Sequence, residues 1–308
     1  MKDNHIRIGS RGSKLALYQA NQVSDALKRA IPEIHIEIVE VKTKGDKILD
    51  ISLSKIGDKG LFTKEIEELL LADKIDIAVH SLKDLPTILP EGLKISGVLP
   101  RHEVRDALIT TDNRKLNDLS SNTVIATSSL RRKSQLLAYN PDFKIIDIRG
   151  NVETRLQKLK DGYCDALVMA GAGLLRLGYD EEISELISPN NILPAVSQGI
   201  IAIESKLGRT DIEDVIAKIN HQESLVIGEA ERSFMHALEG GCQVPVAIYT
   251  EKIGIQVKFT GYVGSLDGVK SIKEQITGNF SETKILANEL ALKILKEGGE
   301  KILASIRV

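Results

Sequence analysis

The amino-acid sequence predicts an α/β protein built from two similar halves, followed by a smaller α+β part. Strand-like apolar runs alternate with amphipathic helical patterns in residues 6–79, and the same order of elements recurs in residues 124–176. After about residue 219 the pattern changes to short alternating runs, which are typical of antiparallel strands. The length of 308 residues allows two or three domains, since a domain usually has ~100–200 residues.

The first half is predicted to contain three strands and two helices. The strands are expected at residues 6–9, 34–41 and 77–79, and the helices run through Ala16, Ala20, Val23 and Leu27 and through Phe62, Ile66 and Leu70. A tight turn, Ser10–Ser13, precedes the first helix. Residues 44–60 are rich in Lys and Gly and show little periodicity, which predicts a loop of low stability.

The second half repeats this order. Strands are expected at residues 124–127, 144–148 and 165–169, with helices after Ser128-Ser129, after Arg149-Gly150-Asn151 and after Ala170. An Asp opens the last strand of each half, Asp76 in the first and Asp165 in the second. Sequence identity between the halves is low, so a common origin and an independent one are both open.

Two apolar runs, at residues 95–98 and 199–204, lie outside the repeated pattern at the ends of the second half. They are interpreted as paired connections that form a hinge over a central cleft. Beyond them we predict a helix at 224–238, a small sheet from 246–249 and 256–262, and a closing helix with Leu286, Leu290 and Ile294. The expected domains are therefore residues 1–98 with 200–219, residues 99–199, and residues 220–308.

The composition excludes several classes of protein. A net charge of −2, 4% aromatic residues and no Trp argue against a nucleic-acid-binding surface. The two cysteines, Cys164 and Cys242, provide no disulfide framework and favour a reducing compartment. Residues 1–7 lack the apolar stretch of a signal peptide, and no apolar run reaches the ~18 residues of a spanning helix. We therefore expect a cytoplasmic protein.

The stretch from Asp76 to Pro86 contains the first candidate site. Ser81, Lys83 and Asp84 directly follow a short buried strand, and in open α/β sheets ligands bind beyond the carboxyl ends of strands. The alternative is a solvated turn with two charges. A lone carboxylate among many cations suits the stabilisation of a cationic intermediate or the binding of a substrate N–H group, which makes Asp84 the candidate catalytic residue.

Arginines follow four of the predicted strands. They are Arg11, the pair Arg131 and Arg132, Arg149 with Arg155, and Arg176, with Ser13, Ser128 and Ser129 as further donors. Helix N-termini favour anions, and a guanidinium binds a carboxylate by two parallel hydrogen bonds. Any one of these arginines alone is better explained as part of a surface ion pair. Together they predict a binding site for a ligand with many carboxylates.

Other ligand classes are less favoured. Phosphate is a rival anion, but no glycine-rich phosphate-binding pattern follows a strand. No cluster of His and Cys has the spacing of a metal site, and His80 alone is better explained as a hydrogen-bonded residue at a strand end, so we predict no metal. Cys242 follows Gly240-Gly241, which permits an exposed turn, although a buried structural cysteine is the commoner case.

Seven motifs together resemble the porphobilinogen deaminase (hydroxymethylbilane synthase) family. They are Arg11-Gly-Ser13, Lys59-Gly-Leu-Phe62, His80-Ser-Leu-Lys-Asp-Leu-Pro86, Thr127-Ser-Ser-Leu-Arg-Arg132, Arg149-Gly-Asn151, Leu193-Pro-Ala-Val-Ser-Gln-Gly199 and Glu239-Gly-Gly-Cys-Gln-Val-Pro245. The resemblance covers residues 6 to about 250 in the right order. Ser197 departs from it, because the family usually has Gly at that position.

The resemblance implies a transferase that polymerises four porphobilinogen molecules head to tail into hydroxymethylbilane and releases ammonia, a step of tetrapyrrole and haem biosynthesis. It implies a dipyrromethane primer joined as a thioether to Cys242, and it makes Asp84 the catalytic carboxylate. Residues that match the family's cofactor-binding positions are Lys83, Ser81, Ser129, Arg131, Arg132, Arg149 and Arg155. Those expected at the substrate are Arg11, Ser13, Phe62, Arg149, Arg155 and Arg176.

The same resemblance implies two periplasmic-binding-protein-like domains, a small third domain that carries the cysteine, a mobile loop at 44–60, and a monomer. The alternative function is a non-catalytic, two-lobed binding protein for polycarboxylate anions. Such a binder has no use for Cys242 or Asp84, and it normally carries a secretion signal or a DNA-binding domain, neither of which the sequence contains.

Overall fold

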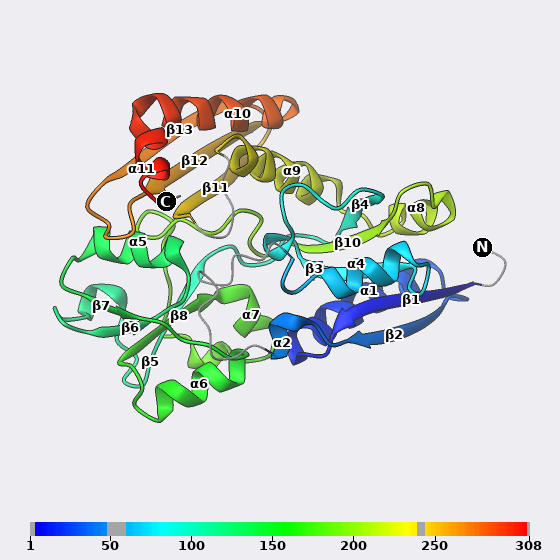
Figure 1. The fold of residues 1–308 in the computed structure, drawn as a ribbon, viewed down its shortest axis with the longest axis horizontal. Coiled ribbons are helices and arrows are strands. Elements are labelled where there is room, and N and C mark those ends of the chain that lie inside the picture. Colours follow the sequence, from blue (N-terminus) through cyan, green and yellow to red (C-terminus); the bar gives the residue numbers. More distant parts are fainter. Residues whose placement is uncertain (1–3, 48–59, 239–243, 307–308) are drawn as a thin grey trace. The chain divides into compact units, whose positions relative to one another are not determined.

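The structure is a computed structural model that describes residues 4–47, 60–238 and 244–306. The described chain divides into two compact units. Unit 1 consists of residues 4–47, 60–102 and 199–226, and unit 2 consists of residues 103–198, 227–238 and 244–306. Each unit is built around its own β-sheets, which Figure 1 shows in the colours of the sequence.

Unit 1 contains a five-stranded sheet in the order β2-β1-β3-β10-β4. The strands are β1 (His5–Arg11), β2 (His35–Val41), β3 (Ile77–Ser81), β4 (Leu93–Val98) and β10 (Ile201–Lys206). Its helices are α1 (Lys14–Ala30), α2 (Lys44–Lys47), α4 (Lys64–Leu71) and α8 (Thr210–Ala217), with a 3-10 turn η1 (Leu82–Asp84). Strand β1 runs parallel to β2 and β3, whereas β10 is antiparallel to β3 and β4.

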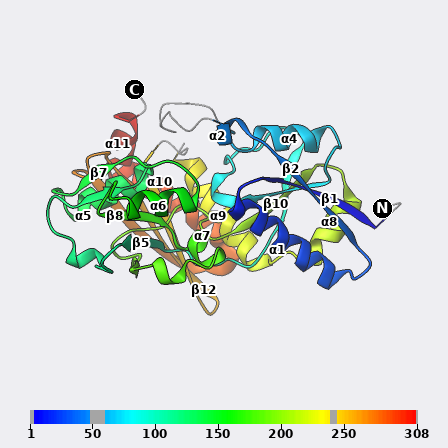
Figure 2. The ribbon, with the colours of Figure 1, turned by 90° about the horizontal axis from the view of Figure 1, so that it is seen from below.

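Helices cover both faces of this sheet. Apolar residues of α1 and α8 pack with Ile77 and Val79 of β3, and those of α4 pack with Ala78 on the opposite face. Figure 2 shows α1 and α4 on opposite sides of the strands. The alternation along β3 is the period of two that a strand imposes, and a strand buried on both faces has the continuous apolar sequence seen here.

Unit 2 contains a second five-stranded sheet, in the order β7-β6-β8-β5-β9. Its strands are β5 (Asp106–Thr110), β6 (Val124–Ala126), β7 (Lys144–Ile146), β8 (Ala166–Ala170) and β9 (Glu185–Leu186). Its helices are α5 (Leu130–Tyr139), α6 (Val152–Lys160) and α7 (Gly171–Arg176), with the 3-10 turns η2 (Leu116–Asp118) and η3 (Asp180–Glu182). Three parallel strands followed by an antiparallel one occur in both sheets, which confirms the predicted pair of similar α/β halves.

The repeated Asp has the same role in both sheets. Asp76 Oδ2 accepts a hydrogen bond from the backbone N–H of Arg7 at 3.0 Å, and Asp165 Oδ2 accepts one from that of Val124 at 2.7 Å. In each case the Asp precedes the third parallel strand and binds the start of its neighbour. A carboxylate that bonds a backbone N–H fixes the register at the amino ends of the parallel strands.

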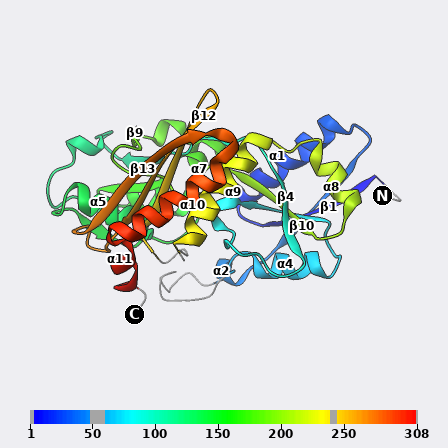
Figure 3. The same cartoon turned by 90° about the horizontal axis from the view of Figure 1, so that it is seen from above.

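Unit 2 also contains a three-stranded antiparallel sheet covered by helices. The strands are β11 (Val246–Ile253), β12 (Gln256–Gly264) and β13 (Ser271–Asn279), and the helical segments are α9 (Gln222–Ala237, whose first residues lie in unit 1), η4 (Phe280–Glu282), α10 (Thr283–Ile294), η5 (Leu295–Gly299) and α11 (Glu300–Ala304). One core combines Phe234 of α9 with Phe259 of β12 and Leu290 of α10. Figure 3 shows α10 lying along this sheet.

The two apolar runs pair as predicted. Residues 95–98 and 199–204 lie with Ala202 opposite Val98, and they form β4 and β10 inside the sheet of unit 1. Strands β5 and β13 were not predicted. The chain passes between the units after residues 102, 198 and 226. The three-domain boundaries, the hinge and the central cleft stay predictions.

Candidate active site

Unit 1 brings four of the predicted site residues to one edge of its sheet. Because β1 and β3 are parallel neighbours, their carboxyl ends lie at the same edge. Arg11 is the last residue of β1, which runs two residues further than predicted, and Ser81 is the last residue of β3. Lys83 and Asp84 follow within η1. This edge is where ligands of open α/β sheets bind.

Asp84 lies on the turn η1, which is anchored on both sides by buried residues. Its neighbours Leu82 and Leu85 are buried, with exposed fractions of 1% and 5%, whereas Asp84 itself is exposed. The backbone N–H of Leu82 donates to the carbonyl of Ile200 on the approach to β10 at 2.9 Å. A carboxylate between two buried leucines keeps a fixed position while it remains accessible to a ligand.

Arg11 and Ser13 are also held in place. The Arg11 guanidinium lies over the ring of Phe62, 4.2 Å from the ring centroid, in a cation–π contact. Ser13 caps α1, because its Oγ accepts a hydrogen bond from the backbone N–H of Ala16 at 3.3 Å. Gln19 of the same helix donates from Nε2 to Ser81 Oγ at 2.8 Å. Helix α1 therefore orders residues at the ends of both β1 and β3.

In unit 2 the ends of β6 and β7 carry capped helix starts. Ser129 caps α5 and Asn151 caps α6 through side-chain oxygens. Gly150 has φ +115°, and a Cβ there would meet Thr154 Cγ2 at 2.6 Å, so this position requires glycine. Arg155 Nε donates to the Gly150 carbonyl at 2.8 Å.

Arg149 lies three residues beyond β7, whereas Arg176 is separated from the end of β8 by a short helix. Burial lowers the pKa of Arg149, and the nearby charge of Asp147 opposes that shift. Arg176 is the last residue of α7, the helix that directly follows β8. Because β7, β6 and β8 are mutually parallel, the residues after them occupy one edge of the sheet.

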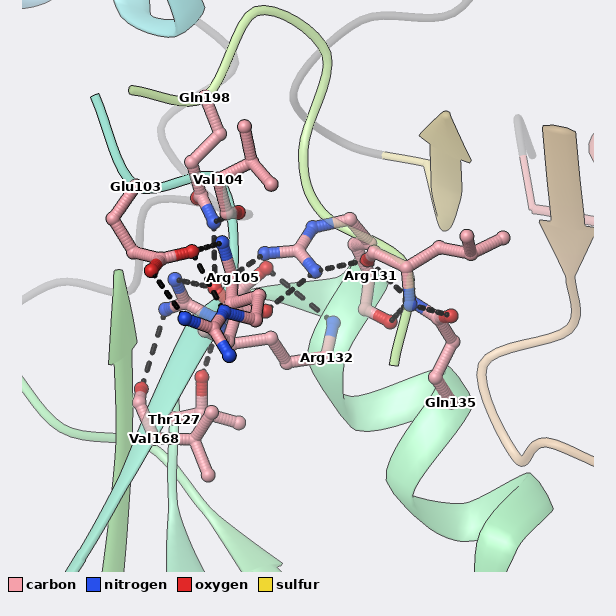
Figure 4. A network of polar contacts seen from close by, with 12 residues as sticks. Glu103, Val104, Arg105, Thr127, Arg131, Arg132, Gln135, Val168 and Gln198 are labelled. Carbon is pink, nitrogen blue, oxygen red and sulfur yellow. Dashed lines mark hydrogen bonds and ion pairs between the residues drawn. The ribbon is translucent and has the colours of Figure 1, made fainter. Parts of the chain in front are cut away.

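Arg131 and Arg132 are not surface residues, since both are buried and bind a carboxylate that we did not predict. Arg131 Nη1 donates to Asp106 Oδ2 at 2.7 Å and to the carbonyl of Leu193 at 2.6 Å. Arg132 Nη2 donates to Asp106 Oδ1 at 2.8 Å, and its Nη1 donates to the Val168 carbonyl at 3.2 Å. Figure 4 shows both side chains converging on this network.

Two glutamines complete the network. Gln198 Nε2 donates to Asp106 Oδ1 at 2.9 Å and to the Val104 carbonyl at 2.7 Å. Gln135 binds Leu193 twice, donating to its carbonyl and accepting from its N–H. Burial alone would raise the pKa of Asp106, but the charges of the two guanidinium groups outweigh it and hold that pKa well below its usual range.

The network carries an excess of positive charge. Two guanidinium groups face one carboxylate, and the three side chains are exposed by 9% or less. Within the residues that the structure describes, Nε of Arg132 has no hydrogen-bond partner. A buried cation with a free donor is costly unless an anion binds it, so this end of α5 fits a ligand carboxylate.

Other predicted residues lie outside the described part of the chain or outside the site. Cys242 and residues 48–59 of the predicted loop belong to the undescribed segments. Cys164 is buried, and burial raises the pKa of its thiol to about 11, which makes it unreactive. No group of His, Cys, Asp and Glu that could hold a metal occurs among the described residues. None of the described helices is long and apolar enough to span a membrane.

The chain matches two family models in order. Residues 6–214 match "Porphobilinogen deaminase, dipyromethane cofactor binding domain", and residues 226–296 match "Porphobilinogen deaminase, C-terminal domain". The chain belongs to the porphobilinogen deaminase family. It is therefore an enzyme with a dipyrromethane cofactor-binding domain, and the resemblance inferred from the seven motifs is confirmed.

Curated relatives agree with this assignment. The chain is 49% identical to a porphobilinogen deaminase of Syntrophomonas wolfei, over 98% of this chain and 99% of that one. It is 46% identical to a porphobilinogen deaminase of Geobacter sp. strain M21, over 98% and 94% of the two chains. Among solved structures, the VFT2 domain of Bordetella pertussis BvgS gives a TM-score of 0.44 at 15% identity, covering 73% of this chain and 92% of that chain. That likeness concerns the fold alone.

Proposed function

We propose that the chain polymerises four porphobilinogen molecules head to tail into hydroxymethylbilane, with release of ammonia, and that Asp84 is the catalytic carboxylate. The observation that carries the proposal is the exposed Asp84 on an anchored turn beyond β3, in a chain of this family. A carboxylate fixed there can stabilise positive charge as ammonia leaves, and it can accept hydrogen bonds from pyrrole N–H groups.

The cofactor is proposed to be attached through Cys242. The cysteine follows two glycines, a sequence that permits an exposed turn. When bound, dipyrromethane supplies the pyrrole carbon to which the first substrate unit is joined. Its carboxylates would be held by a set of side chains at strand ends: Ser81, Lys83, Ser129, Arg131, Arg132, Arg149 and Arg155. The unpartnered Nε of buried Arg132 supports this assignment.

The substrate is proposed to be bound through its acetate and propionate groups. The residues assigned to this role are Arg11, Ser13, Phe62, Arg149, Arg155 and Arg176. Phe62 acts by orienting Arg11, since the guanidinium lies over its ring. An arginine that is already oriented loses less conformational entropy when it binds a carboxylate.

A cytoplasmic location and a monomeric state also stay proposals. The first is supported by two cysteines that provide no disulfide framework. Because the chain has a net charge of −2, it offers no general attraction to polyanions, which supports the absence of a nucleic-acid partner.

The experiment that tests this function is the intact mass of the purified protein, followed by peptide mapping. We expect an added mass of two linked pyrrole units on Cys242, present in the Cys164→Ser control and lost in Cys242→Ser. If the purified protein carries no adduct, it is incubated with porphobilinogen and its mass is measured again. If no adduct forms even then, or if the adduct lies on Cys164, the proposed attachment is wrong.

Turnover of Asp84→Ala and Asp84→Asn tests the catalytic role separately. We expect both variants to fold as the parent does, because the side chain is exposed, and to form no hydroxymethylbilane. Near-normal product formation by either variant would show that Asp84 is not the catalytic group.

A further inference from the structure

Three titratable side chains are buried together on the face of the unit 1 sheet that α4 covers. They are Glu67 of α4, His80 of β3 and Glu204 of β10, with exposed fractions of 6%, 6% and 0%. His80 Nε2 lies 3.2 Å from Glu204 Oε2. The proposed function uses none of the three, although β3 leads directly into the turn that carries Asp84.

The strand register explains why these groups meet. In the antiparallel pair of β3 and β10, Ala202 lies opposite His80 and Glu204 lies opposite Ala78, so His80 and Glu204 are diagonal neighbours on one face. The register between β10 and β4 shifts between Ile203 and Glu204, an irregularity of the kind that redirects a side chain. Ala78 packs against α4, and the same face therefore meets Glu67.

The cluster is poorly satisfied as a purely structural element. Among the described residues, both carboxylate oxygens of Glu204, Oε1 of Glu67 and Nε2 of His80 make no hydrogen bond of acceptable geometry. His80 Nε2 thus approaches Glu204 Oε2 without good hydrogen-bond alignment. Buried polar groups in native proteins are usually paired, and exceptions call for a functional explanation.

Burial of two carboxylates beside one imidazole favours an uncharged form for one of the carboxylates. Burial raises the pKa of Glu67, the nearby hydroxyl of Thr63 opposes this shift, and the charge of Glu204 reinforces it. At the start of α4, Glu65 accepts a hydrogen bond from the backbone N–H of Lys44.

We propose that His80 is a positioning residue for Asp84, held by its contact with Glu204 in a buried cluster that also contains Glu67. His80 is the penultimate residue of β3, and its contact with Glu204 at 3.2 Å joins it to β10. Two residues further along, the backbone N–H of Leu82 donates to the Ile200 carbonyl. Leu82 is the first residue of η1, the turn that carries Asp84. The inference rests on the proposed catalytic role of Asp84.

Loss of a proton from the cluster leaves buried charge unbalanced. If Glu67 ionises, its carboxylate faces that of Glu204 within the same buried cluster. The end of β3 then loses its fixed position, and the turnover number falls as the pH rises. Misplacement of a catalytic group by about 1 Å can lower a rate by about 10²-fold.

The test is the pH profile of kcat and KM for the holoenzyme and three variants. Glu67→Gln cannot ionise, so we expect it to match the parent kcat at neutral pH and to retain it to a higher pH. His80→Gln should lower kcat, by up to about 10²-fold, with little change in KM. The double variant His80→Gln with Glu204→Gln should recover part of this loss, because it removes the unpaired anion as well.

A matched control is Glu213→Gln, which removes a carboxylate from the same unit at a partly exposed ion pair with Lys94. Its profile should superimpose on that of the parent. Thermal unfolding reports whether each variant folds. If His80→Gln does not fold, the pH profile of Glu67→Gln tests the inference by itself. A Glu67→Gln profile identical to the parent's would overturn the inference.

The two proposals fail in different ways. Retained turnover in Asp84→Asn contradicts the catalytic role of Asp84, whatever the cluster does. A parent-like profile for Glu67→Gln, or for a folded His80→Gln, together with an inactive Asp84→Asn, contradicts only the positioning role of His80.

Discussion

The carboxylate of Asp106 accepts a hydrogen bond from the guanidinium of Arg131 at 2.7 Å, deep inside unit 2. The same carboxylate also accepts a hydrogen bond from Arg132. One anion therefore holds the first turn of α5 and both of the arginines that the family resemblance assigns to the cofactor. Because Asp106 neutralises only one of the two charges, the pair keeps a net charge of +1 toward an incoming carboxylate. Asp106 therefore acts through the arginines that it orients.

Replacement of Asp106 by Asn should strongly destabilise the protein. The variant keeps the shape of the side chain but leaves two buried guanidinium groups without their anion, and breaking a buried ion pair in this way costs ~3–5 kcal/mol. Denaturant unfolding measures the loss. Asp112→Asn, which removes a surface partner of Arg114, is the control and should leave the midpoint unchanged. A midpoint for Asp106→Asn equal to that of the control would contradict the assignment.

Acid stability should depend on the same carboxylate. The pKa of Asp106 is lowered in the folded state, because the two arginines outweigh the effect of burial, so the unfolded chain binds more protons at acid pH. The ionised Asp106 therefore stabilises the fold fully at pH values above about 3.9, the pKa of Asp in an unfolded chain. This stabilisation is lost as the pH falls below that value. Unfolding free energies measured between neutral and strongly acid pH should fall less steeply in Asp106→Asn than in the parent.

The sequence predicted most of the strands because parallel strands buried on both faces are continuous apolar runs. Strand β5 was missed, since it contributes only three apolar residues after a buried Asp106. Edge strand β13 was missed because its side chains alternate between exposed and half-buried, with little apolar content. Asp76 and Asp165 were correctly matched to each other, although their bonds to neighbouring strands needed the structure.

The sequence predicted those site residues whose position follows from the strand just before them. Residues directly after strands, such as Ser81 and Asp84, lie at the sheet edge where the pattern predicted them. The burial of Arg131 and its bond to Asp106 join residues that are 25 positions apart, and no periodicity connects them. The sequence offers one signal for this contact, an Asp directly before the short apolar run 107–109.

Ser197 should be tolerated because its hydroxyl offsets a strained backbone. It has φ +59°, the left-handed region, and its Oγ donates to the Gly228 carbonyl at 3.3 Å. Ser197→Gly removes both the strain and the bond and should change the unfolding free energy little. Ser197→Ala keeps the strain and loses the bond, which should cost about 1 kcal/mol. Equal midpoints for the Ala and Gly variants would contradict this explanation.

Replacement of Arg149 or Arg155 should interrupt chain growth rather than folding. Arg149 follows β7, and Arg155 lies on α6. A histidine at either position no longer offers a planar guanidinium to a carboxylate. We expect stalled elongation or failed primer assembly, visible as an altered ladder of covalent intermediates on a native gel. Lys160→Gln, at an exposed ion pair on the same helix as Arg155, is the control. An unchanged ladder would place these arginines outside the binding site.

The contact between Arg11 and Phe62 should set the affinity for substrate. Phe62→Leu removes a cation–π interaction of about 0.5–1 kcal/mol that helps to orient the guanidinium, so KM for porphobilinogen should rise about two- to fivefold. Phe62→Tyr keeps the aromatic face and should retain the parent KM. Steady-state kinetics of the two variants measure the difference. A KM for Phe62→Leu that equals that of Phe62→Tyr would show that the ring does not orient Arg11 for binding.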